Sequence, residues 1–499
     1  MPCDERPRGH PPGKLTFLSF AALSLERLLA LVLIAIVAAV FGATRQSSTY
    51  FLALIVPITL GVAMSEALYT ALLPPFTGPT RPPRTLLYSA LRVAAPLAVI
   101  ATGLYVAVVL AVSPSQVSVW LAFSPVLGGT ALNGVYAAFL TAGRRYSLAI
   151  LRVPLASAIA LAFVGGVLPF WRSTTALALG ISLGQVLTLA VLALRAHDAP
   201  RDDGEGRRIG GWELAASAAT VLAATLVGSQ LVIVGERFLA SGLAAGAVAL
   251  LAFARGIALL PAMFAQALGS GIFPAATERW QMLERESLAR LVLTGVRLSI
   301  LAGLVSTAFV VISRRELVQI AFERDAFGSG DTRETATLVA ILAASLAGVS
   351  AGAAGAKALF ALGRRSLVLA ISATGVGLYV VAAIILRELH GLDGLASAFT
   401  VASVIGGLLF VVVLVPSLEL PLGQAVREWV VAPGLLAAAF TGGALAVGLP
   451  LGGSHPTFTA ALGAAVAVAF GGLAALAAAI RLSHGLEYSL LTQTAARLR

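Results

Sequence analysis

The feature that most constrains this chain is a series of long apolar runs separated by short polar segments. A helix that crosses a bilayer needs about 20 apolar residues. Fourteen runs meet this requirement, and each is continuously apolar instead of alternating, which excludes transmembrane β-strands. The sequence therefore predicts an all-α polytopic membrane protein with about 14 transmembrane helices, near residues 18–43, 50–73, 86–112, 117–141, 147–170, 174–195, 212–235, 243–273, 288–312, 334–361, 366–387, 394–416, 426–449 and 457–481.

Composition supports a membrane protein without catalytic chemistry. Of the 499 residues, 59% are hydrophobic and 11% are charged, which is too little polar surface for a soluble protein of this size. The 50 glycines favour close packing between transmembrane helices. The single cysteine, Cys3, and five scattered histidines predict neither a metal site nor a cofactor. No phosphate-binding Gly-Lys-Ser/Thr loop and no Gly-x-Ser-x-Gly elbow occurs, so we do not expect an enzyme.

Basic residues occur mainly in the segments that follow the even-numbered runs and at the two ends of the chain. Cytoplasmic loops carry an excess of Lys and Arg, so these segments are predicted to lie in the cytoplasm together with both termini. The net charge of +11 is spread over short loops instead of one patch. A nucleic-acid partner is therefore not expected.

The longest polar segment between apolar runs is HDAPRDDGEGRRIG, 197–210, which follows the sixth run. It divides the membrane part into six, six and two spans. Many transporters consist of two helical bundles that rock around a central cavity. The predicted organisation is thus a cytoplasmic N-terminal segment, an N-lobe, a cytoplasmic linker, a C-lobe, two C-terminal helices and a cytoplasmic tail, at 1–17, 18–196, 197–211, 212–416, 417–481 and 482–499.

The segment AFERDAFGSGDT, 321–332, places several charges between two apolar runs. In the stretch that precedes and includes it, Leu317, Ile320 and Phe327 fall on one side at roughly helical spacing. We expect a short amphipathic helix at the membrane interface, with Glu316, Glu323 and Arg324 facing water. Asp331, three residues before Glu334, is expected to cap the following span.

The same segment resembles a motif of the MurJ/MviN family of lipid II flippases, which lies within the multidrug/oligosaccharidyl-lipid/polysaccharide exporter superfamily. The family pattern is F-E-R-G-A-F-T-x-x-D-T, and this chain reads FERDAFGSGDT. Six further segments resemble family motifs in the same order: VFGATRQSSTYFLALIVP (40–57), SEALYTALLPPF (65–76), ERFLAS (236–241), ALGSGIFP (267–274), AKALFALGRRS (356–366) and GLDGLASAFTVAS (391–403).

This resemblance implies two lobes around a central cavity in a bacterial cytoplasmic membrane. It also implies translocation of an undecaprenyl-diphosphate-linked glycan, with lipid II as the leading candidate, from the inner to the outer leaflet by alternating access. The expected partners are that glycan lipid and membrane lipids, with a coupling cation as a further candidate. A diphosphate crosses hydrocarbon at high cost unless cations pair with it, and arginine binds phosphate oxygens bidentately.

Several charged positions of the family pattern, two of them arginines, are lost in this chain. The span-one arginine and acid of the family fall on Leu33 and Ile34, an aspartate falls on Ser48, and an arginine falls on Ile55. The cavity is therefore expected to be less basic than in the family pattern, which leaves the identity of the glycan open.

Four candidate substrate-binding residues remain: Arg27, Glu66, Arg255 and Lys357. Arg27, Glu66 and Lys357 occupy positions that carry charge in the family, and Arg255 lies one position from an expected cation. Glu66 and Arg255 lie deep in apolar runs, where an ionised group is costly unless it faces a cavity or a partner. For Arg27 and Lys357 the alternative is a side chain that extends from a helix end to the interface.

The secondary candidates are Glu26, Arg92 and Arg152. Glu26 and Glu66 are the two potential partners of Arg27. Arg92 and Arg152 lie one or two turns inside their spans, so extension to the cytoplasmic interface is their simpler interpretation.

Three other functions stay open from the sequence. The first is a flippase for a different lipid-linked oligosaccharide, which the lost arginines favour. The second is a cation-coupled multidrug exporter, in which Glu66 would serve as the ion-binding carboxylate. The third is a non-transporting scaffold in cell-wall assembly.

Overall fold

The computed structural model describes residues 12–76, 84–112, 116–143, 145–197, 218–219, 222–223, 226, 230–263, 285–451 and 458–482. Every regular element in this part of the chain is helical, which confirms the predicted all-α class. Nine of the described helices are long and apolar enough to cross a membrane, or ten if the bent pair α14 and α15 counts as one span. The count of 14 stays a prediction, because parts of the expected spans at 212–235 and 243–273 lie outside the described residues.

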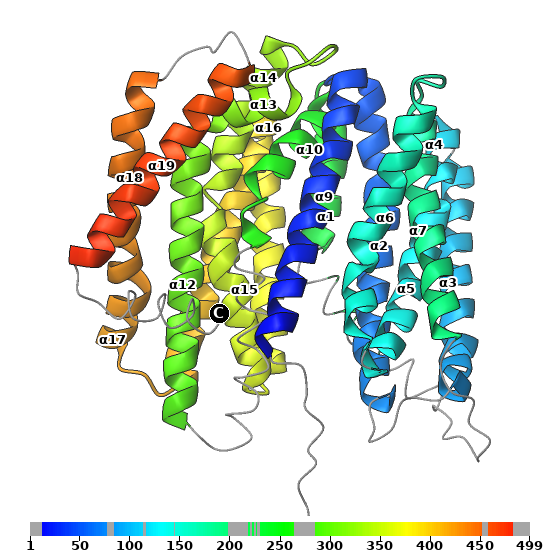
Figure 1. Cartoon of the computed structure of the whole chain (residues 1–499), viewed down its shortest axis with the longest axis horizontal. Coiled ribbons are helices and arrows are strands. Elements are labelled where there is room, and N and C mark those ends of the chain that lie inside the picture. Colours follow the sequence, from blue (N-terminus) through cyan, green and yellow to red (C-terminus); the bar gives the residue numbers. More distant parts are fainter. Residues whose placement is uncertain are drawn as a thin grey trace, which may run out of the picture.

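The first group of helices, here called the N-lobe, occupies the right side of Figure 1. Helix α5 packs against α2, α3, α6 and α7 and so forms its centre. Helices α4 and α5 together make the span predicted at 117–141. The N-lobe consists of α1 (Pro12–Phe41), α2 (Arg45–Phe76), α3 (Arg84–Val112), α4 (Val117–Ala122), α5 (Ser124–Ala142), α6 (Tyr146–Val167) and α7 (Thr174–Ala196).

Most of the second group, here called the C-lobe, lies to the left of α1 in Figure 1, and its helix α9 overlaps α1 in this view. Helix α16 contains the two spans predicted at 366–387 and 394–416, which are separated at Gly391, where φ is 57° and ψ is −124°. The C-lobe consists of α9 (Leu231–Ser241), α10 (Ala247–Ala258), α12 (Arg285–Ile312), α13 (Arg314–Phe322), α14 (Ser329–Ala343), α15 (Leu346–Ala361) and α16 (Arg365–Ser417).

The C-terminal helices pack against α12 of the C-lobe. An ion pair joins the buried Arg297 of α12 to the partly buried Glu428, with 2.5 Å between Nη1 and Oε2. Trp429 donates a hydrogen bond from Nε1 to the carbonyl oxygen of Leu293 over 3.0 Å. These contacts fix α17 (Leu422–Val426), the π-helix η2 (Arg427–Val431) and α18 (Ala432–Leu451), against which α19 (Phe458–Leu482) packs.

Small residues allow close approach of helix backbones, as the glycine content predicts. Gly348 of α15 lies against Gly407 of α16, and a methyl group at either position would collide with the backbone of the other helix.

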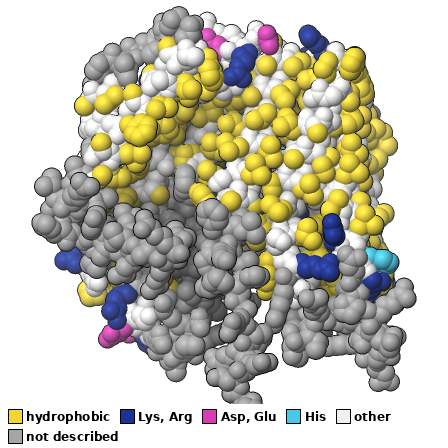
Figure 2. Space-filling view, viewed as in Figure 1, with side chains coloured by type: hydrophobic (Ala, Val, Ile, Leu, Met, Phe, Trp, Pro, Cys, Tyr) yellow, Lys and Arg dark blue, Asp and Glu magenta, His cyan; other side chains and the backbone are white. Residues whose placement is uncertain are grey.

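The outward faces of the helices are apolar. On α3, Val99, Ile100 and Leu104 are 65–70% exposed. Figure 2 shows hydrophobic side chains across the described part of one face of the molecule. The protein is therefore a multi-pass membrane protein.

The predicted amphipathic helix forms as α13, but its burial differs from the expectation. Glu316 is buried instead of facing water, while Arg324 is exposed as predicted. The cause is that α13 packs against α1, α14 and α19, which cover more of its surface than a membrane interface would.

The predicted cap is also displaced. Helix α14 begins at Ser329, and Asp331 lies inside its first turn, where it accepts a hydrogen bond from the Gly328 amide over 3.3 Å.

Candidate functional site

Three of the predicted residues are electrostatically coupled, with Glu66 as the group that the other two share. Glu66 of α2 interacts electrostatically with Arg152 of α6 and with Lys357 of α15. Glu66 is exposed. Of its two charged neighbours, Arg152 belongs to the N-lobe and Lys357 to the C-lobe. The Arg152 guanidinium lies 5.8 Å from the centroid of the Tyr69 ring, one turn from Glu66 on α2. We call Glu66, Arg152 and Lys357 the inner charge cluster.

The position of this cluster along the helices places it on the predicted cytoplasmic half. Lys357 lies four residues before the end of α15, and Glu66 lies ten residues before the end of α2. At 1.5 Å per residue, these charges are about 6 to 15 Å inside the helix ends. Two cations and one carboxylate leave a net positive charge there, which suits an anion that carries more than one charge.

Arg27 and Glu26 lie on α1, the N-lobe helix that packs against α6 of its own lobe and against α10 and α13 of the C-lobe. The Arg27 side chain is 50% exposed, and its Nε lies 3.3 Å from Glu26 Oε2. Glu26 is thus the partner that the sequence suggested. The ion pair neutralises Arg27 only in part, because half of the Arg27 side chain is exposed and its charge is therefore screened by solvent.

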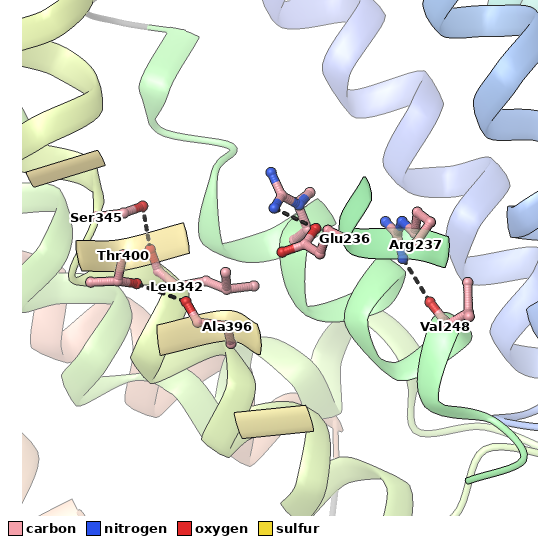
Figure 3. Close-up of polar contacts among 8 residues, drawn as sticks. Glu236, Arg237, Val248, Leu342, Ser345, Ala396 and Thr400 are labelled. Carbon is pink, nitrogen blue, oxygen red and sulfur yellow. Dashed lines mark hydrogen bonds and ion pairs between the residues drawn. The ribbon is translucent and has the colours of Figure 1, made fainter. Parts of the chain in front are cut away.

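Arg255 does not lie free between the lobes. Its Nη2 is 2.5 Å from Oε2 of Glu236, which is fully buried. The Arg255 guanidinium carbon also lies 4.1 Å from the centroid of the Phe399 ring, in a cation–π contact. In Figure 3, Glu236 and the neighbouring Arg237 come from the same helix, and Arg237 donates a hydrogen bond to the carbonyl oxygen of Val248 over 2.6 Å.

Arg92 is separate from both charged groups. It is exposed on α3, a helix that packs against α2, α4 and α5 inside the N-lobe. This placement fits a side chain that extends toward the membrane interface.

A chain of aromatic rings joins the lobes at the opposite end from the inner charge cluster. Phe253 of α10 is its centre, with ring centroids 5.3–5.4 Å from those of Phe51, Phe322 and Phe327. Phe51 in turn contacts Tyr50, which contacts Phe123. All six rings are buried. We call Tyr50, Phe51, Phe123, Phe253, Phe322 and Phe327 the aromatic cluster.

Backbone contacts reinforce this junction. Ala326, in the loop after α13, donates its amide hydrogen to the carbonyl oxygen of Ala39 over 3.0 Å. Gly42 and Gly246 have φ values of 59° and 93°, and a methyl group on them would collide with the carbonyl oxygens of Ala326 and Ala43, respectively. The loop that the sequence places at the membrane interface is thus packed across the end of α1.

Sequence reasoning assigned no role to Glu236, Arg237 or Phe253. Glu236 and Arg237 form a charged pair within the apolar stretch LVIVGERFLAS, and such a pair inside a predicted span is a signal for a functional or paired site. Phe253 carries no comparable signal, because a phenylalanine in an apolar run is ordinary.

Comparisons with known proteins agree with the fold. The family model described as lipid II flippase MurJ matches residues 154–451, more than half of the chain. A solved structure of lipid II flippase MurJ in an inward closed conformation superposes with a TM-score of 0.76 at 15% identity, covering 94% of this chain and 100% of that one.

Two multidrug transporter structures are similar at lower scores. An inward-facing MATE transporter of the MOP superfamily gives a TM-score of 0.62 at 13% identity over 81% of this chain and 99% of that one. The Vibrio cholerae MATE transporter VcmN in its bent form gives a TM-score of 0.57 at 14% identity, covering 84% of this chain and 99% of that one. No match was found among curated protein sequences. The fold is thus shared with two transporter groups, whereas the sequence match is to one, and the chain belongs to the MurJ lipid II flippase family.

Proposed function

We propose that this protein translocates a polyprenyl-diphosphate-linked glycan, with lipid II as the leading candidate, from the inner to the outer leaflet of a bacterial cytoplasmic membrane by alternating access. The observation that carries the proposal is the inner charge cluster, in which the exposed Glu66 is electrostatically coupled to Arg152 of its own lobe and to Lys357 of the other lobe. A diphosphate is costly to place in hydrocarbon, so a flippase needs cations at the junction of its lobes.

The two cations have complementary properties for this task. The guanidinium of Arg152 is held over the Tyr69 ring, which orients its planar donors. Lys357 adds a point charge with three donors from the opposite lobe. A diphosphate bound between them would link the lobes through its oxygens, which gives the headgroup a direct means to alter how the lobes contact each other.

The aromatic cluster supports an arrangement that is closed on the other side. Its six buried rings join α2 and the end of α4 to α10 and α13. With the predicted orientation, the headgroup would enter from the cytoplasm while this end is closed. Opening of the aromatic cluster would then release it outward.

The C-terminal helices offer a surface for the polyprenyl tail. Phe440, Ala444 and Val468 of α18 and α19 pack with residues of α12 in one apolar cluster. Phe470 on α19 is 69% exposed, so apolar surface continues outward from this cluster. This position would keep the tail in an apolar environment while the headgroup stays between the lobes.

Transport of a different lipid-linked glycan is the second candidate. It is favoured because Arg255, the cation expected in span eight, is already paired with Glu236. Fewer free cations then face the substrate than the family pattern would provide.

The direct test measures lipid II translocation in proteoliposomes with wild-type protein and the variants Lys357→Met and Glu66→Gln. Loss of one charge-assisted contact costs about 1.5–3 kcal/mol, so we expect Lys357→Met to lower the rate at limiting substrate about tenfold or more. Arg92→Gln is the matched control and should behave as wild type, because Arg92 lies away from the inner charge cluster.

Two outcomes would contradict parts of the proposal. Equal rates for Lys357→Met and wild type would remove the inner charge cluster from the headgroup site. Translocation of another polyprenyl-diphosphate glycan, but not of lipid II, would favour the second candidate. Rescue of cells depleted of their lipid II flippase gives an independent measurement of the same choice.

A further inference from the structure

We propose that the break between α14 and α15 is a hinge within the C-lobe. At this hinge α14 tilts together with α10 and α13, while α15 stays fixed to α12 and α16. The C-lobe then moves as two parts, whereas the bundles of many transporters rock as rigid bodies. The hinge belongs to the fold and does not depend on which glycan is carried, so it goes beyond the proposed function.

Helices α14 and α15 form one span that is bent by 40° at Ala344 and Ser345. Sharp bends in helices come from proline or glycine, or from a side chain that takes over a backbone hydrogen bond. Residues 341–347 contain neither proline nor glycine. The cause of the bend therefore lies in side chains that bond the backbone.

Hydroxyl groups bond the carbonyl oxygens at the break. The amide of Ser345 donates to the carbonyl oxygen of Leu342 over 3.0 Å, three residues earlier instead of four. The Ser345 hydroxyl adds a second bond to Leu342 over 2.6 Å (Figure 3). The carbonyl oxygen of Ile341 instead accepts a hydrogen bond from the Thr400 hydroxyl of α16 over 2.7 Å. A turn of 3₁₀ type in the middle of a helix often marks a hinge.

The bond from Thr400 can be released without leaving polar groups unpaired. Its hydroxyl also lies 3.2 Å from the carbonyl oxygen of Ala396, one turn earlier in its own helix (Figure 3). If α14 moves into line with α15, the Ser345 amide meets the Ile341 carbonyl four residues earlier, as in a regular helix. Thr400 then keeps Ala396 as its acceptor. Both forms satisfy the same groups, which a hinge inside a membrane requires.

The second half of the span is fixed to its neighbours. Helix α15 packs against α12 and α16. A methyl group on Gly303 of α12 would lie 2.7 Å from the Cα atom of Ala347, so these two backbones touch. The contact between Gly348 and Gly407 holds α15 to α16 in the same way. Lys357 lies on this half, so it stays in place when α14 tilts.

The first half of the span packs most extensively against a helix of the aromatic cluster. This helix is α10, which carries Phe253, and α14 also contacts α13, which ends at Phe322. The two rings are in contact, with 5.3 Å between their centroids. A tilt of α14 therefore acts on the aromatic cluster and leaves the C-lobe part of the inner charge cluster undisturbed.

The pivot lies on the side of α12. The Thr307 hydroxyl lies 2.9 Å from the carbonyl oxygen of Ala343, the last residue of α14, and 2.9 Å from that of Gly303 in its own helix. Because Ala343 is at the end of α14, this contact persists while the rest of the helix tilts. Helix α14 has 15 residues, so straightening by 40° moves its start by about 15 Å.

The test measures distances between two spin labels by pulsed electron spin resonance, in the whole protein in lipid nanodiscs without substrate. A Cys3→Ser background leaves no other thiol in the chain. Labels at Arg333→Cys of α14 and Glu388→Cys of α16, two exposed positions, report the tilt. Labels at Phe360→Cys of α15 and Arg290→Cys of α12 report the fixed half. We expect two distances for the first pair and one for the second.

Thr400→Val removes the hydroxyl that bonds Ile341 and keeps the shape of the side chain. The ratio of bent to straight forms should fall about fivefold, because the Ile341 carbonyl loses its donor in the bent form alone. Thr400→Ser keeps the hydroxyl and should restore the ratio. If Thr400→Val is not recovered, Ser345→Ala removes the bond to Leu342 and should shift the ratio in the same direction.

Thr441→Val on α18 is the matched control. The Thr441 hydroxyl bonds the carbonyl oxygen of Ala437 in its own helix over 2.7 Å, so the same substitution there should leave the ratio unchanged.

Three results would overturn the proposal. A single narrow distance for the first pair that Thr400→Val does not change shows a rigid C-lobe. An equal effect of Thr441→Val shows that the loss of any threonine hydroxyl is sufficient. An equal spread of distances in the fixed half shows that the whole lobe loosens. Each result can occur while lipid II is still translocated, so failure of the hinge and failure of the proposed function are distinguishable.

Discussion

The two junctions between the lobes are built from opposite chemistry. The aromatic cluster at one end consists of buried rings, and the inner charge cluster at the other consists of one carboxylate and two cations, of which Glu66 is exposed. Apolar rings that pack together exclude water and ions, whereas exposed charges are hydrated and exchange partners readily. The comparison favours a division of roles in which the aromatic cluster holds the lobes together and, as proposed above, the inner charge cluster accepts a ligand.

The largest effect is expected from fixing the aromatic junction in its closed form. In a Cys3→Ser background, Ala39→Cys and Ala326→Cys place two thiols where the backbone amide and carbonyl groups of these residues are 3.0 Å apart. Oxidation should abolish translocation because the headgroup then has no outward exit, and a reductant should restore it. Translocation by vesicles before and after reduction is the measurement.

The matched control for this disulfide joins two helices of one lobe. Thr307→Cys and Ala343→Cys connect α12 to α14, where the Thr307 hydroxyl lies 2.9 Å from the Ala343 carbonyl oxygen. Oxidation there should leave translocation intact. If both disulfides stop transport equally, the closed aromatic junction is not the specific cause.

The second largest effect, a loss of stability of the closed aromatic junction, is expected from Phe253→Ala. Removal of a buried phenylalanine costs about 3–5 kcal/mol, so the thermal midpoint should fall and the closed junction should lose its central ring. Phe470→Ala is the control, because this side chain is 69% exposed and leaves no internal cavity. Similar midpoints for the two variants would show that the rings do not hold the junction together.

The smallest effect is expected from Gly42→Ala. The left-handed φ of 59° at Gly42 is unfavourable for alanine by about 1–2 kcal/mol, and the new methyl group would meet the Ala326 carbonyl oxygen. The closed state should lose stability, seen as slower cross-linking of the Ala39→Cys and Ala326→Cys pair. Gly103→Ala on α3, which has open space around it, should be neutral. Faster cross-linking in Gly42→Ala would contradict the importance of this contact.

Much of the candidate site could be found from the sequence, but its partners could not. Glu66 and Lys357 are detectable because charge inside an apolar run is costly and therefore conspicuous. Arg255 is detectable for the same reason, but its partner is not. Its pairing with Glu236 depends on how the turn between α9 and α10 brings these two helices together. The burial of Glu316 depends likewise on the helices packed around α13.

The sequence by itself determined the helical class and the approximate positions of the spans. The physical reason is that lipid offers no hydrogen bonds, so a backbone segment inside it must satisfy its own polar groups as a helix. Tertiary structure alone decided which helix faces meet. An apolar run presents similar side chains on all sides, and contacts between small residues and rings then select the pairs that bring Phe253 to Phe327, Arg255 to Glu236 and Lys357 to Glu66.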